Sequence, residues 1–244
     1  DGLVATFLMI AATFALGYLL ARRFAVRADV ALLVTAGTAI CGGSAIAAVA
    51  PLIRARATDV ATAIGVVFAL NALALAVFPT AGAGMELDAA SFGRWCALGI
   101  HDMSSVVGAA TTHSHQALEI ATVTKLARVV WILPIGIVIV RFRARQHSSG
   151  QARPKGPAVP WFLVAFLVAA AAGTVVPSAQ SLCIDIARTA PIGMSLALFA
   201  IGLGMTRALR GVLGRTLGFG LALWIALTVS ALLYVASRRA PVSY

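Results

Sequence analysis

The chain has 244 residues, of which 61% are hydrophobic and 11% are charged, and its formal net charge is +11. This composition, with a mean hydropathy of +0.97, excludes a water-soluble globular domain, in which about 25% of residues are charged. The positive charge does not indicate nucleic-acid binding, because the arginines lie in short connections between apolar runs and form no basic patch with interleaved aromatics. We expect an all-α polytopic membrane protein with no nucleic-acid partner.

Eight apolar segments follow one another along the chain and predict a single transmembrane domain, 1–244. They cover residues 2–20, 31–53, 60–78, 92–112, 118–140, 161–176, 191–205 and 217–236. The third segment is expected to close at Pro79. The loop 80–91 carries Glu86 and Asp88 and no basic residue, so we place it outside, whereas the arginine-rich loop 141–158 is predicted to be cytoplasmic.

The start of the chain and its cysteines add two expectations. The sequence opens at Asp1 and enters a hydrophobic run at once, without the basic n-region or the cleavage site of a signal peptide. We therefore expect the chain to begin inside a longer protein. Cys41, Cys96 and Cys183 are an odd number of cysteines within or beside apolar segments, which implies no disulfide framework.

The second and fourth segments contain residues that disfavour a continuous helix. Gly42 and Gly43 lie at the middle of the small-residue stretch 37–51, and two adjacent glycines carry a backbone-entropy cost inside a helix. In a bilayer, a broken helix is tolerated only where it is buried in protein or lines a wet cavity. The sequence therefore predicts a break at Gly42-Gly43, and a second break at His101-Asp102.

The distribution of charge favours re-entrant segments over full crossings. If every segment crosses the membrane, Arg54 and Arg56 fall outside and the acidic loop falls inside, against the positive-inside rule. If the segments at about 31–56 and 92–116 enter and leave on the same side, both conflicts disappear. We predict two re-entrant helices, with broken crossing helices as the alternative.

An offset of 60 residues, the separation of Cys41 and His101, aligns the two broken segments without a gap. Ser44 then pairs with Ser104, and the DVAT of 59–62 pairs with the EIAT of 119–122. Two such segments entering from opposite faces would form the inverted repeat of secondary transporters, whose substrates bind near the midplane between broken helices.

The chain resembles the YeiH family of bacterial membrane proteins, also called UPF0324. Its residues 37–51, GTAICGGSAIAAVAP, are similar to the family's GTSICGASAIAA. The GIHD of 99–102 with the VV of 106–107 is similar to IHDTxQVV, and the KLAR of 125–128 is similar to KLTR. The chain departs from these motifs at Ala39, Gly43, Ser105 and Ala127, where the family has Ser, Ala, Gln and Thr.

The resemblance implies a multi-pass protein of the bacterial inner membrane, with further transmembrane segments before the first one here. Members are often labelled sulfate exporters, but that label is one of analogy. The departure at Ser105 bears on substrate selectivity, so the family's substrate does not transfer directly.

Lys125 and Arg128 lie three residues apart on one face of the fifth segment, inside its apolar run. Intramembrane charges usually face a cavity or a partner. The functional interpretation is a cationic clamp for an oxyanion, in which the arginine forks two oxygens and the lysine acts as a point charge. The alternatives are internal pairing with Asp102 or Glu119, or snorkelling to an interface.

Polar residues surround the predicted glycine break. Thr38, Cys41 and Ser44 stand around Gly42-Gly43, where hydroxyls and free backbone N–H groups at a half-helix N-terminus would suit an anion. The alternative is tight helix packing of small residues.

The second break carries His101-Asp102, with Ser104 and Ser105 as the counterparts of the serine in the first. The histidine could relay a proton under the influence of the carboxylate. The alternative is a hydrogen-bonded pair that locks the segment to its neighbour.

A metal site is not expected. His113 and His115, even with His101, lack a cysteine or carboxylate at the usual ligand spacing, and they fit an interfacial turn. We expect no metal and no cofactor. Asn71, in the third segment, is expected to bond a neighbouring helix or to face the cavity.

Together these features predict a secondary transporter that moves a small anion (sulfate-like, an organic sulfonate or a carboxylate) by alternating access. The coupling ion, a proton or sodium, is left open, as are the direction of transport and assembly into a homo-oligomer. A cation/proton antiporter of similar architecture is the alternative, with Asp102 binding the cation and Lys125 neutralising helix dipoles. An intramembrane hydrolase using Cys41 or Ser44 with His101 is less favoured, because no nucleophile-elbow motif is present, and we expect no enzyme activity.

Overall fold

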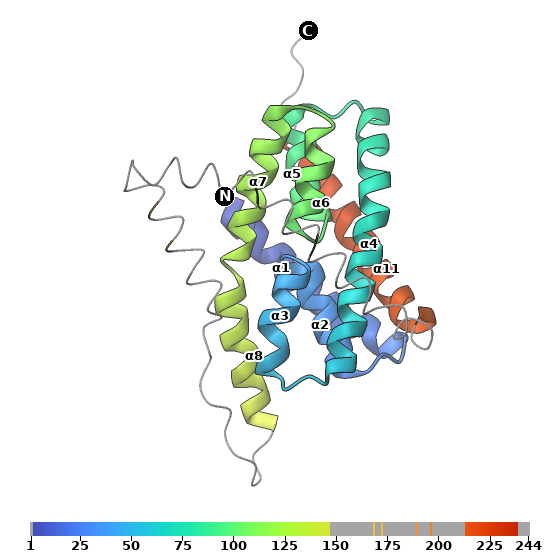
Figure 1. Ribbon diagram of the computed structural model, residues 1–244, viewed down its shortest axis with the longest axis vertical. Coiled ribbons are helices and arrows are strands. Elements are labelled where there is room, and N and C mark those ends of the chain that lie inside the picture. Colours follow the sequence, from blue (N-terminus) through green and yellow to red (C-terminus); the bar gives the residue numbers. More distant parts are fainter. Residues whose placement is uncertain are drawn as a thin grey trace.

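The structure, a computed structural model, describes residues 2–146, 168, 172, 189, 196 and 213–238, and within them every regular element is an α-helix (Figure 1). The helices are α1 (Gly2–Arg23), α2 (Ala28–Ala39), α3 (Gly43–Leu52), α4 (Ala57–Gly84), α5 (Ala89–Gly99), α6 (Met103–Thr111), α7 (His115–Val129), α8 (Ile132–Gln146) and α11 (Leu213–Ala236). Apart from isolated positions, the predicted segments 161–176 and 191–205 lie outside the described residues, as does Cys183.

The expectation of an all-α membrane protein is confirmed. In the part of the chain that the structure describes, four helical stretches are long and apolar enough to cross a bilayer. They are Val4–Arg23, Ala57–Gly84, His115–Phe142 and Gly214–Ala236.

Two short helical hairpins lie between these long helices. The first hairpin consists of α2 and α3, which are interrupted between Ala39 and Gly43, and the second consists of α5 and α6, interrupted between Gly99 and Met103. Figure 1 shows the first hairpin entering from the lower end of the bundle and the second from the upper end, with their tips meeting midway. The helices therefore break where the glycine pair and His101-Asp102 were expected to break them. Re-entry into a bilayer stays a prediction.

The helix boundaries follow the offset of 60 residues found in the sequence. Shifted by that offset, the ends of α2 and α5 coincide, and so do the starts of α3 and α6. The long α4 corresponds in the same way to α7 and α8 together. An inverted repeat stays a prediction, but the two hairpins break in the same register.

Several predicted boundaries were wrong. Pro79 does not end a helix, since α4 continues to Gly84. The Thr80 hydroxyl donates to the Ala76 and Val77 carbonyls, each at 3.0 Å. A proline is tolerated within a membrane helix where neighbouring groups satisfy the backbone groups that it frees.

The fifth predicted segment is also divided differently. It is interrupted between α7 and α8, near Trp131. Because α8 continues to Gln146, the basic loop predicted at 141–158 begins later than expected. Its residues 147–158 lie outside the described residues.

Tight C-terminal turns connect the hairpins to the long helices. The residues after α1, α3 and α4 have positive φ although none is glycine: Ala25 (51°), Arg54 (51°) and Glu86 (47°). After α3, for example, the N–H of Ala55 donates to the Ala50 carbonyl at 2.9 Å, as in a Schellman cap. Figure 1 shows the α1–α2 and α3–α4 connections at one end of the bundle and the α4–α5 connection at the other. The basic and the acidic connections thus lie at opposite ends, although their sides of a membrane stay a prediction.

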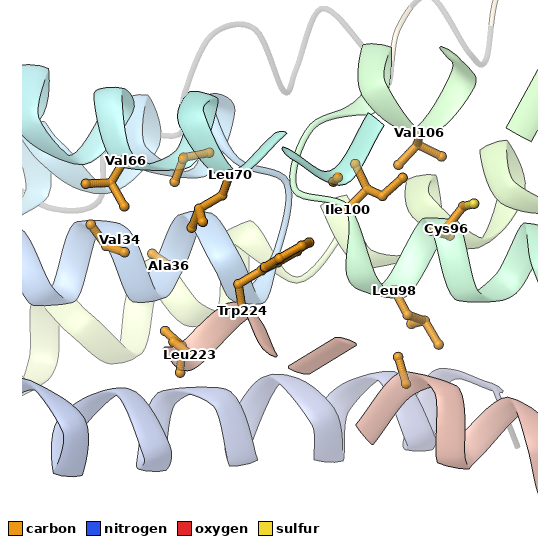
Figure 2. Close-up of a cluster of buried hydrophobic side chains, with 14 of the residues drawn as sticks. Val34, Ala36, Val66, Leu70, Cys96, Leu98, Ile100, Val106, Leu223 and Trp224 are labelled. Carbon is orange, nitrogen blue, oxygen red and sulfur yellow. The ribbon is translucent and has the colours of Figure 1, made fainter. Parts of the chain in front are cut away.

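One apolar core joins both hairpins to α4 and α11. The Phe78 ring stacks on Trp95 with centroids 4.1 Å apart, and the Trp224 ring lies 6.4 Å from Phe78. Figure 2 shows Trp224 between side chains of α2 and α4 and those at the end of α5. A Cβ at Gly99 would lie 2.6 Å from the Phe78 ring, so only glycine allows α5 to approach α4 this closely. This packing fixes the tip of the second hairpin.

Candidate functional site

The two hairpin tips contact one another directly. The Thr38 hydroxyl lies 3.1 Å from Nε2 of His101. Gly42 has a φ of +67°, and a Cβ there would lie 3.3 Å from the backbone nitrogen of Asp102. Because an L side chain rarely adopts that backbone conformation, the first hairpin can turn at this point only with glycine. Gly43, by contrast, is an ordinary residue of α3, and a Cβ on it would lie 3.7 Å from the Phe68 ring.

Asn71 of α4 organises the second tip. Its Oδ1 accepts from the backbone N–H groups of His101 (3.1 Å) and Asp102 (3.4 Å), and its Nδ2 donates to Oδ2 of Asp102. The other carboxylate oxygen, Oδ1, accepts from Ser105 N (2.6 Å) and from Ser104 Oγ (2.9 Å). The carboxylate is therefore the N-cap of α6, which is the locked, hydrogen-bonded alternative for this residue. The bonding role expected for Asn71 is also present.

Lys125 and Arg128 are both 0% exposed, and both donate to backbone carbonyls at the ends of the broken helices. The Lys125 ammonium donates to the carbonyls of Ile100 (2.6 Å) and Ala97 (3.3 Å). The Arg128 guanidinium donates to Leu98 O (2.6 Å) in the second hairpin. It also donates to Ala39 O in the first hairpin, so one side chain ties both helix ends together. Cations at helix C-termini neutralise the negative ends of the dipoles.

These contacts exclude two of the alternatives for the cations. Snorkelling is wrong, because neither charge reaches the surface. Pairing with Glu119 is also wrong, since that carboxylate faces His115 at 3.3 Å and both side chains are exposed. Direct binding of an anion stays a prediction, since most of the observed contacts of both cations are with carbonyl groups.

The tips have a buried side and an accessible side. Thr38, Cys41 and His101 are buried with the two cations, whereas Asp102 and Ser104 are half-buried and Ser44 is exposed. The Ser44 hydroxyl donates to the Cys41 carbonyl at 3.3 Å. The side of the tips on which α3 and α6 begin is therefore the more exposed one.

The two half-helix N-termini differ. That of α6 is capped by Asp102, whereas no side chain caps α3 at Gly42. Among the described residues, Nδ1 of His101 and Nε of Arg128 are buried without a hydrogen-bond partner. The tips thus carry two cations and one carboxylate, and no side chain caps the positive end of α3.

The histidines occupy different environments. His101 directs Nε2 at the Thr38 hydroxyl, 3.1 Å away, inside the contact between the tips. His113 lies in the turn after α6, where its Nε2 donates to the Leu87 carbonyl (2.8 Å) and its ring stacks on Phe92 with centroids 4.9 Å apart.

Sequence reasoning missed two residues at the tips. Trp224 donates from Nε1 to the Gly99 carbonyl at 2.9 Å, and so satisfies the remaining carbonyl at the end of α5. Trp131, at the α7–α8 break, packs against the first tip beside Cys41, and its Nε1 is buried without a partner in the described part of the chain. The only signal in the sequence was the presence of tryptophan in apolar segments, which is common.

Comparison with known proteins places the chain in a family. A family model described as "Conserved hypothetical protein 698" matches residues 1–217. A UPF0324 membrane protein of Vibrio vulnificus is 39% identical over 240 residues, covering 98% of this chain and 76% of its own. A UPF0324 membrane protein of Bdellovibrio bacteriovorus is 40% identical over 228 residues, covering 92% and 69%. No solved structure matches. The chain therefore belongs to the UPF0324 family of membrane proteins.

Proposed function

We propose that this protein is a secondary transporter for a small anion: sulfate-like, an organic sulfonate or a carboxylate. The observation that carries the proposal is the charge at the hairpin tips. Two fully buried cations, Lys125 and Arg128, donate to carbonyls at the C-terminal ends of the broken helices, and the tips also carry one carboxylate, Asp102, and an uncapped half-helix N-terminus. The anion would bind at that N-terminus, near Gly43 and Ser44.

The electrostatics favour an anion at this place. The half-helix C-termini of α2 and α5 contribute about −0.5 charge each, and the N-termini of α3 and α6 about +0.5 each, so the four ends cancel. The side chains then leave one net positive charge, with His101 neutral. An uncompensated charge inside a membrane is costly, and an anion on the free N–H groups of α3 would offset it. Lys125 and Arg128 would attract the anion through their electrostatic field. They would also contact it directly if the tips rearrange during transport.

Alternating access would involve the hairpins. The tips are joined by the Thr38–His101 contact and by Arg128, which donates to Leu98 O and Ala39 O. Opposed broken helices around a midplane site are typical of secondary transporters, in which one repeat moves against the other. In this proposal the hairpins are re-entrant, and Arg128 keeps the tips together until the anion is bound. Proton coupling through His101 and Asp102, or coupling to sodium, is left open.

The test is anion uptake into proteoliposomes containing the full-length protein. We expect Lys125→Met and Arg128→Met to abolish sulfate or sulfonate uptake, while Arg22→Gln, which removes an equal charge from an exposed position, retains it. Melting temperatures in detergent identify variants that no longer fold. For these, Arg128→Lys keeps the charge but loses the fork that reaches both hairpins. Uptake unchanged in folded Lys125→Met and Arg128→Met protein would refute the proposal.

One observation favours the second candidate, a cation/proton antiporter. Lys125 donates to the carbonyls of Ile100 and Ala97, which is the dipole-neutralising role expected of it there. Against it, the Asp102 carboxylate already accepts from Ser105, Ser104 and Asn71. A pH-dependent cation flux that is insensitive to the anion would select the antiporter. We propose no enzyme activity.

A further inference from the structure

A partly open cavity of about 110 Å³ lies between α1, α5, α7 and α11. Of the residues that line this outer cavity, only Leu98 also takes part in the contacts of the tips, through its carbonyl. The lining residues used below are Met9, Arg94, Leu98, Thr124 and Tyr234. Since one water takes about 30 Å³ in the liquid, the cavity has room for several waters or one small ionic group.

Arg94 is the charged residue of the outer cavity. It lies at the middle of α5, the helix that follows the acidic α4–α5 connection. Among the residues that the structure describes, no hydrogen bond or ion pair of its guanidinium is recorded. Arg94 is exposed, so an ion or a lipid headgroup can reach it, and the positive-inside rule gives no reason for an arginine in the helix that follows the acidic connection.

The rest of the lining suits an anionic group. Thr124 and Tyr234 bring hydroxyls, while Met9 and Leu98 supply apolar walls. A second cation is close, because the Arg238 guanidinium lies 5.6 Å from the centroid of the Tyr234 ring. A guanidinium with neighbouring hydroxyls is the arrangement that binds carboxylate, sulfate and phosphate oxygens through charge-assisted hydrogen bonds.

We propose that the outer cavity binds an oxyanion group, with Arg94 as its principal ligand. The group is the sulfate, phosphate or carboxylate of a free anion, or the phosphate of a lipid headgroup. The cavity is separate from the hairpin tips but shares one turn of α5 with them, because the Leu98 carbonyl accepts from Arg128 at 2.6 Å. Calorimetry also reports sulfate bound at the tips, so only the part of the binding that Arg94→Gln removes is assigned to the outer cavity.

The first measurement titrates sodium sulfate into the full-length protein in neutral detergent at constant ionic strength, with affinity read by calorimetry. We expect Arg94→Gln to weaken sulfate binding roughly 10- to 100-fold, as for the loss of a hydrogen bond to a charged group. Arg22→Gln is the matched control, because it removes the same charge from an exposed arginine over a tyrosine ring, Tyr18, at the other end of α1. Arg94→Lys should recover part of the affinity.

A second measurement separates a lipid from a free anion. Protein from nanodiscs containing phosphatidylglycerol is analysed by native mass spectrometry for retained lipid. If Arg94→Gln lowers the retention of lipid but leaves the sulfate affinity unchanged, the oxyanion is the phosphate of a lipid headgroup. If Arg94→Gln does not fold, Thr124→Val removes one hydroxyl without changing the charge. It should weaken the sulfate affinity or the lipid retention, whichever the unmodified protein shows, several-fold. Variants at Arg94 and Thr124 that match Arg22→Gln in both measurements would overturn the proposal.

Discussion

The two adjacent glycines of the first hairpin should respond in opposite directions to the same substitution. Gly42 has a φ of +67°, and a Cβ on it would lie 3.3 Å from the backbone nitrogen and Cβ of Asp102. Gly42→Ala therefore forces an L residue into a sparsely populated conformation, at a cost of about 1 to 3 kcal/mol. Gly43 lies in α3, and its Cβ would make only an ordinary contact of 3.7 Å with Phe68. Gly43→Ala should stabilise the protein by about 0.4 to 1 kcal/mol through the unfolded chain.

The predicted difference between the two variants is thus about 1.5 to 4 kcal/mol. For a chain of this size it corresponds to roughly 3 to 16 °C in melting temperature. The assay is thermal unfolding of the purified variants in one detergent at one pH. Transport or anion binding should also decrease in Gly42→Ala, because the turn at Gly42 positions the N-terminus of α3 next to Asp102. Equal melting temperatures for the two variants would refute the geometry of the tip.

Three further predictions use the same melting assay. Asn71→Leu should destabilise the protein by at least about 3 kcal/mol, because two N–H groups and the Asp102 carboxylate lose their partner; a smaller loss would mean that water replaces the amide. Trp224→Phe keeps an aromatic ring but removes the donor to Gly99 O, so we expect a loss of about 1 to 2 kcal/mol, and none if that carbonyl is otherwise satisfied. Arg54→Gly should stabilise by about 1 kcal/mol, since Arg54 has a φ of 51°, and destabilisation would count against the positive φ.

The sequence was informative where backbone geometry demands a residue type. Glycine at 42 and 43 indicated the first break, and the arginines at 54 and 56 with the acidic loop indicated hairpins with opposite directions. The second break, expected at His101-Asp102, lies there as well. Pro79 misled, because a proline within a long membrane helix costs less than in water when neighbouring groups satisfy the backbone.

The contacts of the central site could not be read from the sequence. The charges of Lys125 and Arg128 in an apolar run predicted that they face the interior, and they do. Their acceptors are backbone carbonyls of other segments, and a carbonyl has no signature in the sequence. The same holds for Trp224, whose indole reaches a carbonyl of α5, which lies far from it along the chain. These contacts follow from tertiary packing, which the local pattern does not specify.

The central claim is that positive charge at the hairpin tips binds an anion. It is tested most directly by melting Arg94→Gln protein, in which the outer cavity is disabled, against sulfate, organic sulfonates and carboxylates as both sodium and choline salts. We predict that one class of anion raises the melting temperature whether sodium or choline is the counterion. At an anion concentration of 100 times the dissociation constant, the folded protein should gain about 2.7 kcal/mol of stability. A rise that follows sodium whatever the anion, or no rise with any of these anions, would contradict the account.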